Sequence, residues 1–195
     1  MLVNNAGIAH GGRPFWQLPE ADFARVVDVD LWGVVHGCRS YLPLLIERPE
    51  AAVINLSSVF GLIGVGRQSA YWLSKFAVRG FTESLRMELR ESAPHVRAVV
   101  VQPGAVRTAI ARNSLRAGQP DDVHEADVAA FDRLLARTSP EQTARTIVEG
   151  LLSGRDRIVV GSDARLLDLL ARIVPERYTG LLLRPVRRAV PARSV

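Results

Sequence analysis

Residues 51–75 read AAVINLSSVFGLIGVGRQSAYWLSK, and this stretch decides the fold. Ala51 to Ser58 forms a short apolar run, which is typical of a buried strand in a parallel sheet. A glycine-bearing loop follows, and a helical pattern then runs from Ser69 to Ser92 and ends before Pro94. A buried strand followed by a long helix is the unit from which doubly wound α/β domains are built.

Strand and helix patterns alternate along the rest of the chain, which predicts an α/β fold with a doubly wound parallel sheet. Pro43 is expected to bend or end the first long helix. Ser139 with Gln142 has the pattern of a capping box, and Ser162 is expected to cap the last helix. We expect strands at 1–3, 51–58, 96–101 and 157–160, and helices at 19–47, 69–92, 139–154 and from 162 onward.

The chain has 195 residues, of which 48% are apolar and 23% charged, as in a single soluble globular domain. No stretch approaches the roughly 20 apolar residues of a membrane span. The single cysteine, Cys38, excludes an internal disulfide, which fits a reducing cytoplasm. The four histidines lack the spacing of metal ligands, so no metal is expected.

The net charge of +5 comes from the carboxyl-terminal end. Residues 177–195 contain five arginines and no acidic residue, whereas residues 1–176 contain 20 basic and 20 acidic side chains. We therefore expect one domain at 1–176 and a basic tail at 177–195, for which a solvated terminus is the default interpretation. Attachment of the tail to an anionic surface stays an alternative. The body lacks a basic stripe with interleaved aromatic residues, so nucleic acid is not an expected partner.

Lys75 is the only lysine among 25 basic residues, and it follows Tyr71 by four positions. Positions four apart share one face of a helix, with Cβ atoms roughly 5–6 Å apart, so the ammonium is expected beside the phenol. At about 4 Å and an effective dielectric near 20, an opposite charge is worth about 4 kcal/mol. The spacing therefore predicts that Lys75 lowers the pKa of Tyr71. When the pair is taken alone, an ordinary surface lysine is the alternative.

Three further signals follow three of the expected strands. Residues 4–7 read Asn-Asn-Ala-Gly after the first strand, Ser58 ends the second strand, and residues 103–108 read Pro-Gly-Ala-Val-Arg-Thr after the third. The carboxyl ends of parallel strands meet at one edge of the sheet, where ligands bind. We therefore expect a hydroxyl, a phenol and an ammonium to converge at this edge. A serine at a strand end is ordinary turn chemistry by itself, but the set argues against chance.

At this point the chain resembles the carboxyl-terminal two-thirds of the short-chain dehydrogenase/reductase family. The matching pieces are the turn at 4–7, the set of Ser58, Tyr71 and Lys75, and the Pro-Gly turn at 103–104 with Thr108. The resemblance covers residues 1 to about 160. It implies part of a Rossmann-like three-layer α/β/α domain. It also implies hydride transfer between NAD or NADP and a small-molecule secondary alcohol or carbonyl compound.

The resemblance assigns roles to single residues. Tyr71 would act as general acid in reduction and general base in oxidation, and Ser58 would hydrogen-bond the substrate oxygen. Lys75 would lower the pKa of Tyr71 and hold the nicotinamide ribose. Family members often pair through the tyrosine helix and the long helix before it, so a homodimer or homotetramer is expected. The cofactor would contact Asn5, Ala6, Gly7, Tyr71, Lys75, Pro103, Gly104, Val106 and Thr108.

Asp30 departs from the family pattern. The chain reads Val29-Asp30-Leu31-Trp32-Gly33 where the family usually has an asparagine that helps to hold a proton-relaying water. A carboxylate near Lys75 would partly cancel the pull of the ammonium on the pKa of Tyr71. We include Asp30 among the expected catalytic residues as a relay member.

The glycine-rich phosphate turn that opens family members has no counterpart in the sequence, nor has the side chain that separates NAD from NADP. We therefore expect an amino-terminally truncated product or gene model that binds dinucleotide poorly and is inactive or impaired as an enzyme. The alternative is a catalytically silent relative that binds a nucleotide or a protein. The intact Ser58, Tyr71 and Lys75 set favours the enzyme.

Several segments admit two interpretations. Residues 109–138 are polar and partly helical, as in a lid or in a surface excursion. The apolar residues after Ser58 either line a substrate pocket or belong to the core; they are Phe60, Leu62, Ile63 and Val65. Three residues on the helices either form subunit contacts or pack internally; they are Trp32, Val35 and Trp72.

Overall fold

The computed structural model of the chain describes residues 1–64, 66–116, 120–134 and 138–180. Its centre is a parallel sheet with the strand order β1–β2–β3–β4. Each strand pairs with the next one along the chain, so that Val53 lies opposite Leu2 on one side and Ala98 on the other. The predicted doubly wound parallel sheet is confirmed. The strands are Leu2–Asn4, Ala51–Leu56, Val96–Pro103 and Arg157–Val160.

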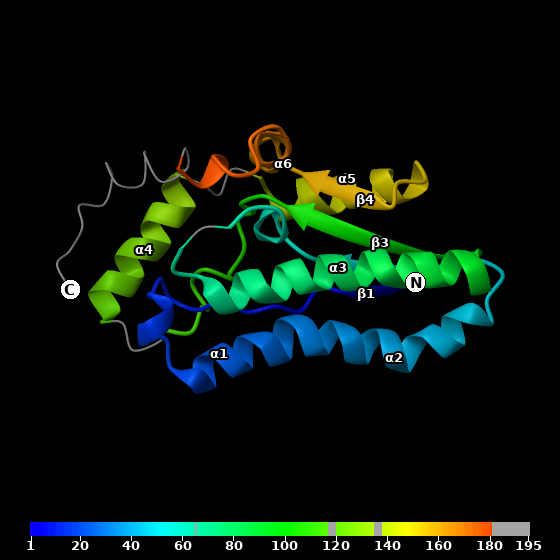
Figure 1. Cartoon of the computed structure of the whole chain (residues 1–195), viewed down its shortest axis with the longest axis horizontal. Helices are drawn as coiled ribbons and strands as arrows, with labels where there is room; N and C mark the ends of the chain where they lie inside the picture. The colour runs from blue at the N-terminus through cyan, green and yellow to red at the C-terminus, as the bar shows by residue number, and fades with distance from the viewer. Residues whose placement is uncertain (65, 117–119, 135–137, 181–195) are drawn as a thin grey trace.

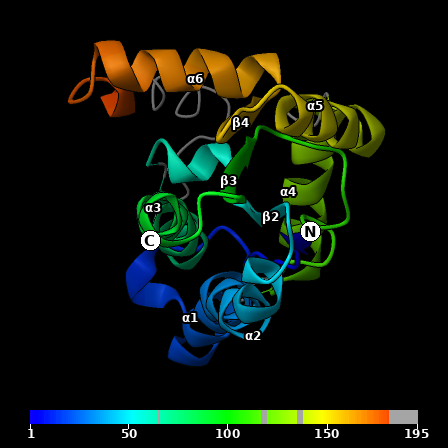
Figure 2. The same cartoon turned by 90° about the vertical axis from the view of Figure 1, so that its right-hand side faces the viewer.

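Helices cover both faces of the sheet because side chains of the buried strands alternate between them. Val53 packs in a cluster with residues of α2 (Gly33–Ile46) and α3 (Ser69–Ser92). Ile54 belongs to a cluster on the other face, against which α5 (Pro140–Leu152) packs. Helix α6 (Ser162–Ile173) lies beside β4 (Figure 2).

The long helix expected at 19–47 consists of three segments: α1 (Glu20–Val27), a π-helical turn at Asp28–Trp32, and α2. Pro43 lies in the last turn of α2, which ends at Ile46. A second irregularity lies at Asp30. A π turn adds one residue to the helical repeat, often at a functional site, and here it contains the fully buried Asp30.

The predicted helix signals are confirmed with one exception. Ser139 and Gln142 form a reciprocal capping box at the start of α5, each side chain binding the other residue's backbone N–H at 3.2 Å. Ser162, however, is the first residue of α6 rather than its cap, and no side-chain hydrogen bond caps this helix. The N-cap position is occupied by Gly161, whose φ of 99° favours glycine.

Helix α4 (Asp121–Leu134) falls in the segment that sequence left open between lid and surface excursion. Figure 1 shows it on the side toward which the arrowheads of β3 and β4 point, beyond the carboxyl ends of these strands. Within the described ranges, no helix combines the length and the apolar composition that crossing a bilayer requires.

Candidate active site

The three sequence signals all lie at the carboxyl edge of the sheet. Residues 5–7 follow β1, Ser58 follows β2 after one intervening residue, and residues 104–108 follow β3. The strands that precede them are neighbours in the sheet, so the turns lie in one row. Helix α3 brings Tyr71 and Lys75 to the same edge within its first two turns.

Lys75 is buried, with 3% of its surface exposed, so the surface-lysine alternative is wrong. Its ammonium lies 5.3 Å from the centre of the Tyr71 ring and donates to the Leu56 carbonyl oxygen at 3.3 Å. A cation near an aromatic face is attracted by the ring quadrupole. The predicted placement of the ammonium beside the phenol thus agrees with the structure.

Asp30 is the closest charged partner of Lys75 among the described contacts. Its Oδ2 lies 3.2 Å from the Lys75 Nζ, and its Oδ1 accepts the Ile8 N–H at 2.7 Å. Burial raises the pKa of Asp30, although Lys75 and the Ile8 N–H both oppose that rise. Gly7 lies over the pair, since a Cβ built there would stand 3.3 Å from Nζ. The π turn, the glycine turn and α3 therefore meet at one buried ion pair.

Lys75 acts on the Tyr71 pKa with the predicted sign, but the pKa is not lowered overall. Burial raises the pKa of Tyr71, and this effect outweighs the opposing pull of Lys75. Asp30 raises the Tyr71 pKa further, whereas the hydrogen bond with Ser58 lowers it. The partial cancellation expected from Asp30 therefore has the predicted sign. What sequence spacing could not include is the desolvation of the phenol. The Tyr71 ring packs edge-on against Phe60, with ring centres 6.1 Å apart.

Ser58 is fixed by a tightly packed turn. Its Oγ accepts the Phe60 N–H at 3.1 Å, at the start of a short 3₁₀ turn at Val59–Gly61. The preceding Ser57 donates from Oγ to the Lys75 carbonyl oxygen at 2.7 Å. A Cβ on Gly61 would stand 2.7 Å from the same carbonyl oxygen, so this turn needs glycine to approach α3. The serine hydroxyl, the phenol and the ammonium thus lie in one corner at the carboxyl edge of the sheet.

Of the apolar residues after Ser58, Leu62 and Ile63 belong to the core. Phe60 stacks on Trp72 with ring centres 4.5 Å apart, and Trp72 packs internally with 6% exposure. Trp32 is 48% exposed, so it remains available for a subunit contact. Val65 lies outside the described residues.

A chain of buried amides fastens β1 to α3 below the site, and sequence analysis missed it. The Asn4 side chain donates to Oδ1 of Asn55 at 2.8 Å, and Asn55 donates to Oγ1 of Thr82 at 3.0 Å. Asn55 and Thr82 are fully buried. An asparagine inside the apolar run of β2 was the signal that could have found this network, because a buried amide requires partners.

The turn at 103–108 is held by two elements that lie far along the chain, and these residues were also missed. The Ala105 N–H donates to Oδ2 of Asp163 at 2.8 Å. The Arg107 N–H donates to the Thr138 carbonyl oxygen at 2.9 Å. The sequence signal was the Gly161-Ser162-Asp163 run directly after β4, at the same edge of the sheet.

His10 is a buried group that the sequence did not single out. It is 1% exposed, and a ring nitrogen, Nδ1, lies 2.8 Å from the Gly11 carbonyl oxygen. Because a carbonyl only accepts, Nδ1 carries the proton in this bond. Burial lowers the pKa of His10. Among the described residues, no group of three or more histidine, cysteine, aspartate or glutamate side chains is placed to hold a metal ion.

Comparisons with known proteins agree with this geometry. A family model described as short chain dehydrogenase matches residues 1–119. SadH of Mycobacterium tuberculosis, which is named as an oxidoreductase, is 45% identical over 190 residues, covering 97% of this chain and 68% of SadH.

Solved structures show the same fold. A short chain dehydrogenase/reductase from Burkholderia phymatum, in complex with NAD, is 28% identical with a TM-score of 0.78, covering 91% of this chain and 66% of that one. A short chain dehydrogenase from Burkholderia cenocepacia J2315, in complex with NADP, is 23% identical with a TM-score of 0.70, covering 94% and 69%; this likeness concerns the fold alone. The chain thus spans about two thirds of the length of these relatives.

Proposed function

Since the chain belongs to the short-chain dehydrogenase family, we propose that it works in hydride transfer between a nicotinamide dinucleotide and a secondary alcohol or the matching carbonyl compound. The observation that carries the proposal is the corner formed by Ser58, Tyr71 and Lys75. In it the Ser58 side chain lowers the pKa of the phenol, and the phenol ring lies beside the ammonium. The dinucleotide supplies or accepts the hydride, as NAD and NADP do in general, and the protein supplies position and proton transfer.

The residues at the edge fit a dinucleotide's nicotinamide end. Asn5 and Ala6 are exposed after β1, and Gly7 carries no side chain above the Lys75 ammonium. Lys75 would hold ribose hydroxyls there. On the opposite side, the backbone of Val106 and Thr108 would meet the carboxamide, with Pro103 and Gly104 forming the turn. NAD is the cofactor bound in the Burkholderia phymatum structure, and either NAD or NADP suits the residues named here.

We propose that Tyr71 acts as the general acid in carbonyl reduction. Because burial raises the pKa of Tyr71, the phenol is protonated at neutral pH and can give its proton to the substrate oxygen. Ser58 would hold that oxygen by a hydrogen bond. Lys75 would then stabilise the phenolate, since the opposite charge lowers the pKa of Tyr71. Asp30 would hold the ammonium and connect it to the backbone at Ile8.

The test uses the complete gene product with NADH and NADPH and a panel of ketones, followed by nicotinamide absorbance. Tyr71→Phe should lower turnover by about 10²–10⁴-fold, the usual contribution of a general acid. Tyr41→Phe is the matched control, because Tyr41 is 53% exposed on α2 and away from the corner. Full turnover by Tyr71→Phe would contradict the proposal. Dinucleotide binding without turnover of any substrate would favour the catalytically silent relative.

We further propose a homo-oligomer that assembles through α2 and α3. These neighbouring helices expose large apolar side chains, which oligomers commonly bury. Sedimentation of the protein at micromolar concentration tests this, and a monomer at all concentrations would contradict it. The buried free thiol of Cys38 fits the cytoplasm as the proposed location. The exposed side chains include Leu44, Leu73, Phe76 and Met87.

A further inference from the structure

One side chain ties the turn at 103–108 to helix α6. The Ala105 N–H donates to Oδ2 of Asp163 at 2.8 Å, although 58 residues separate them along the chain. Asp163 is the second residue of α6. Because its carboxylate is the acceptor, the bond is charge-assisted and stronger than one between neutral groups.

The backbone around the carboxylate is built to admit it. A Cβ added to Gly104 or to Gly161 would overlap the carboxylate oxygens of Asp163, so any side chain at either position would displace the carboxylate. The Gly104 N–H also donates to the Val160 carbonyl oxygen at 2.8 Å, which holds the turn against the end of β4. Two glycines therefore enclose the group that binds Ala105.

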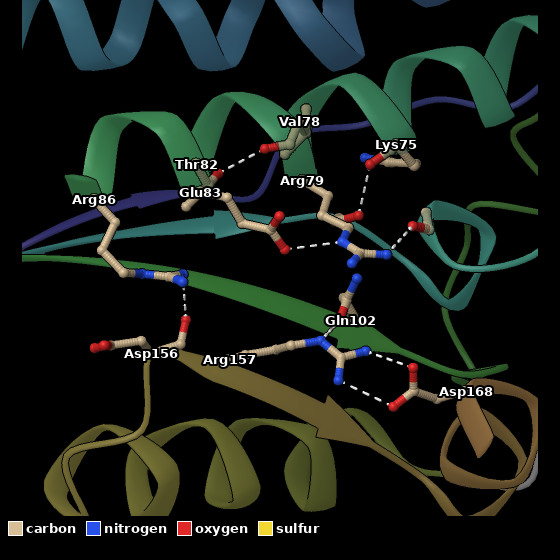
Figure 3. Close-up of polar contacts among 12 residues, drawn as sticks. Lys75, Val78, Arg79, Thr82, Glu83, Arg86, Gln102, Asp156, Arg157 and Asp168 are labelled. Carbon is tan, nitrogen blue, oxygen red and sulfur yellow. Dashed lines mark hydrogen bonds and ion pairs between the residues drawn. The ribbon is translucent and has the colours of Figure 1, made fainter. Parts of the chain in front are cut away.

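A separate contact fixes helix α6 on the sheet, so the helix that carries Asp163 is anchored independently of the turn at 103–108. Arg157 on β4 binds Asp168 with two hydrogen bonds, of 3.0 and 2.8 Å. Figure 3 shows the Arg157 guanidinium between Asp168 and Gln102, to which it donates at 2.7 Å. Asp168 lies five residues after Asp163 on the same helix and makes no described contact with the turn.

The bonds on either side of Val106 determine how its backbone is presented. Ala105 is held by Asp163, and Arg107 donates to the Thr138 carbonyl oxygen at 2.9 Å. Among the described residues, the Val106 N–H has no hydrogen-bond acceptor of its own. Its neighbours are thus fastened to the protein, while no described residue accepts from this donor.

We propose that Asp163 is a positioning residue that sets the Val106 N–H for the dinucleotide, an inference that rests on the proposed function. Asp163 touches no reacting atom; it acts through the Ala105 bond. Losing the carboxylate frees the Ala105 N–H and lets the turn rotate between Gly104 and Arg107. The dinucleotide must then order the turn when it binds, and the cost of this ordering weakens the affinity for dinucleotide. The chemical step is slowed less than binding is weakened.

The test compares Asp163→Ala and Asp163→Asn with the wild-type complete gene product. Asp163→Ala should raise the Kd and KM for dinucleotide about tenfold, about 1.4 kcal/mol, and leave kcat within about threefold. Asp163→Asn keeps a carbonyl acceptor and should recover most of the affinity. Without any dinucleotide, amide hydrogen exchange should show that Asp163→Ala removes protection at the Ala105 N–H.

Asp168→Ala is the matched control, because it removes a carboxylate from the same helix and with it the contact with Arg157 instead. It should lower stability without raising the KM for dinucleotide. If both variants raise KM equally, Asp163 is merely structural and the proposal is overturned. If the wild-type protein neither binds nor turns over dinucleotide, the proposed function is overturned instead. Loss of hydrogen-exchange protection at the Ala105 N–H in Asp163→Ala would still show that Asp163 holds the turn.

Gly104→Ala provides a second way to break the hydrogen bond between the Ala105 N–H and Asp163. Its methyl group must push the Asp163 carboxylate away, so the variant should raise the KM for dinucleotide as Asp163→Ala does. The double variant should have a KM for dinucleotide no higher than that of either single variant, because both substitutions remove the same interaction between Asp163 and the Ala105 N–H. Fully additive effects of the two substitutions would overturn the inference.

Discussion

Asp30→Asn should lower the pKa of Tyr71. Asp30 raises the pKa of the phenol in the wild-type protein, although Lys75, which contacts Asp30, opposes this rise. Asparagine keeps the shape of aspartate and an oxygen that can accept the Ile8 N–H, which Asp30 binds at 2.7 Å. The substitution therefore removes a negative charge and leaves the local hydrogen bond in place.

The size of the effect follows from two distances that share the Lys75 nitrogen. The nitrogen is 3.2 Å from the Asp30 carboxylate and 5.3 Å from the centre of the Tyr71 ring, so the carboxylate is at most about 8.5 Å from the ring centre. At that separation and an effective dielectric near 20, two unit charges interact by about 2 kcal/mol. We expect the acid dissociation constant of Tyr71 to rise roughly tenfold, about 1.4 kcal/mol.

Phenolate absorbance during a pH titration measures the change, with Tyr71→Phe in each background subtracted to isolate this residue. Asp28→Asn is the matched control, because Asp28 is exposed on the same π turn. An unchanged titration in Asp30→Asn would show that the carboxylate exerts no field on the phenol. A rise of the Tyr71 pKa would show that Lys75 loses its charge without Asp30. Either outcome refutes the reasoning. Complete loss of activity in Asp30→Asn also refutes it, because replacing a residue that only takes part in a proton relay should leave activity similar or raise it.

Three further substitutions test the packing around the site. His10→Asn should remove an acid sensitivity: burial lowers the pKa of His10, so below about pH 6.5 the unfolded chain binds a proton that the fold rejects. Urea unfolding at falling pH should show the wild type losing more stability than His10→Asn just below about pH 6.5, with exposed His36→Asn as control. Asp168→Asn should cost roughly 1.5–3 kcal/mol at neutral pH. Because the hydrogen bond from Arg157 lowers the pKa of Asp168, this stabilisation is present above about pH 4 and is lost as pH falls through the lowered pKa, so the cost should shrink in acid. Gly61→Ala should lower thermal stability and disorder Ser58, because its Cβ would meet the Lys75 carbonyl oxygen at 2.7 Å; unchanged melting would contradict this close contact.

Local patterns in the sequence were sufficient for the elements that depend on them. The limits of α3 and the capping box of Ser139 are fixed by neighbouring residues, and the apolar run of β2 reflects burial on both faces. The edge at which Ser58 and Lys75 meet also follows, because parallel strands place their carboxyl ends together.

What the sequence could not provide depends on contacts between distant segments. The π turn at Asp28–Trp32 adds one residue to a helical repeat, and a hydrophobic period is too coarse to show it. The contact of Ala105 with Asp163 depends on where α6 begins after β4. The sign of the Tyr71 pKa shift depends on desolvation, a property of the folded environment that a four-residue spacing does not contain.

The single lysine of the chain allows a test of why arginine was not used. The Lys75 ammonium contacts the Asp30 carboxylate at 3.2 Å and the Leu56 carbonyl oxygen at 3.3 Å, with Gly7 above it. These groups leave room for a compact point charge. A guanidinium is a planar fork of five donors, and it would have to displace the turn at Gly7 or separate the ion pair.

Lys75→Arg should therefore lose activity although it conserves charge. Crowding a well-packed interior costs typically 1–3 kcal/mol, and the displaced cation would no longer oppose the burial that raises the pKa of Tyr71. The measurements are urea unfolding and the phenolate titration of the variant. Arg79→Lys, the reverse exchange one turn later on α3, is the control, since Arg79 forms a partly exposed pair with Glu83 that an ammonium can also make. If Lys75→Arg titrates and unfolds like the wild type, the space around the ammonium does not explain the choice of lysine.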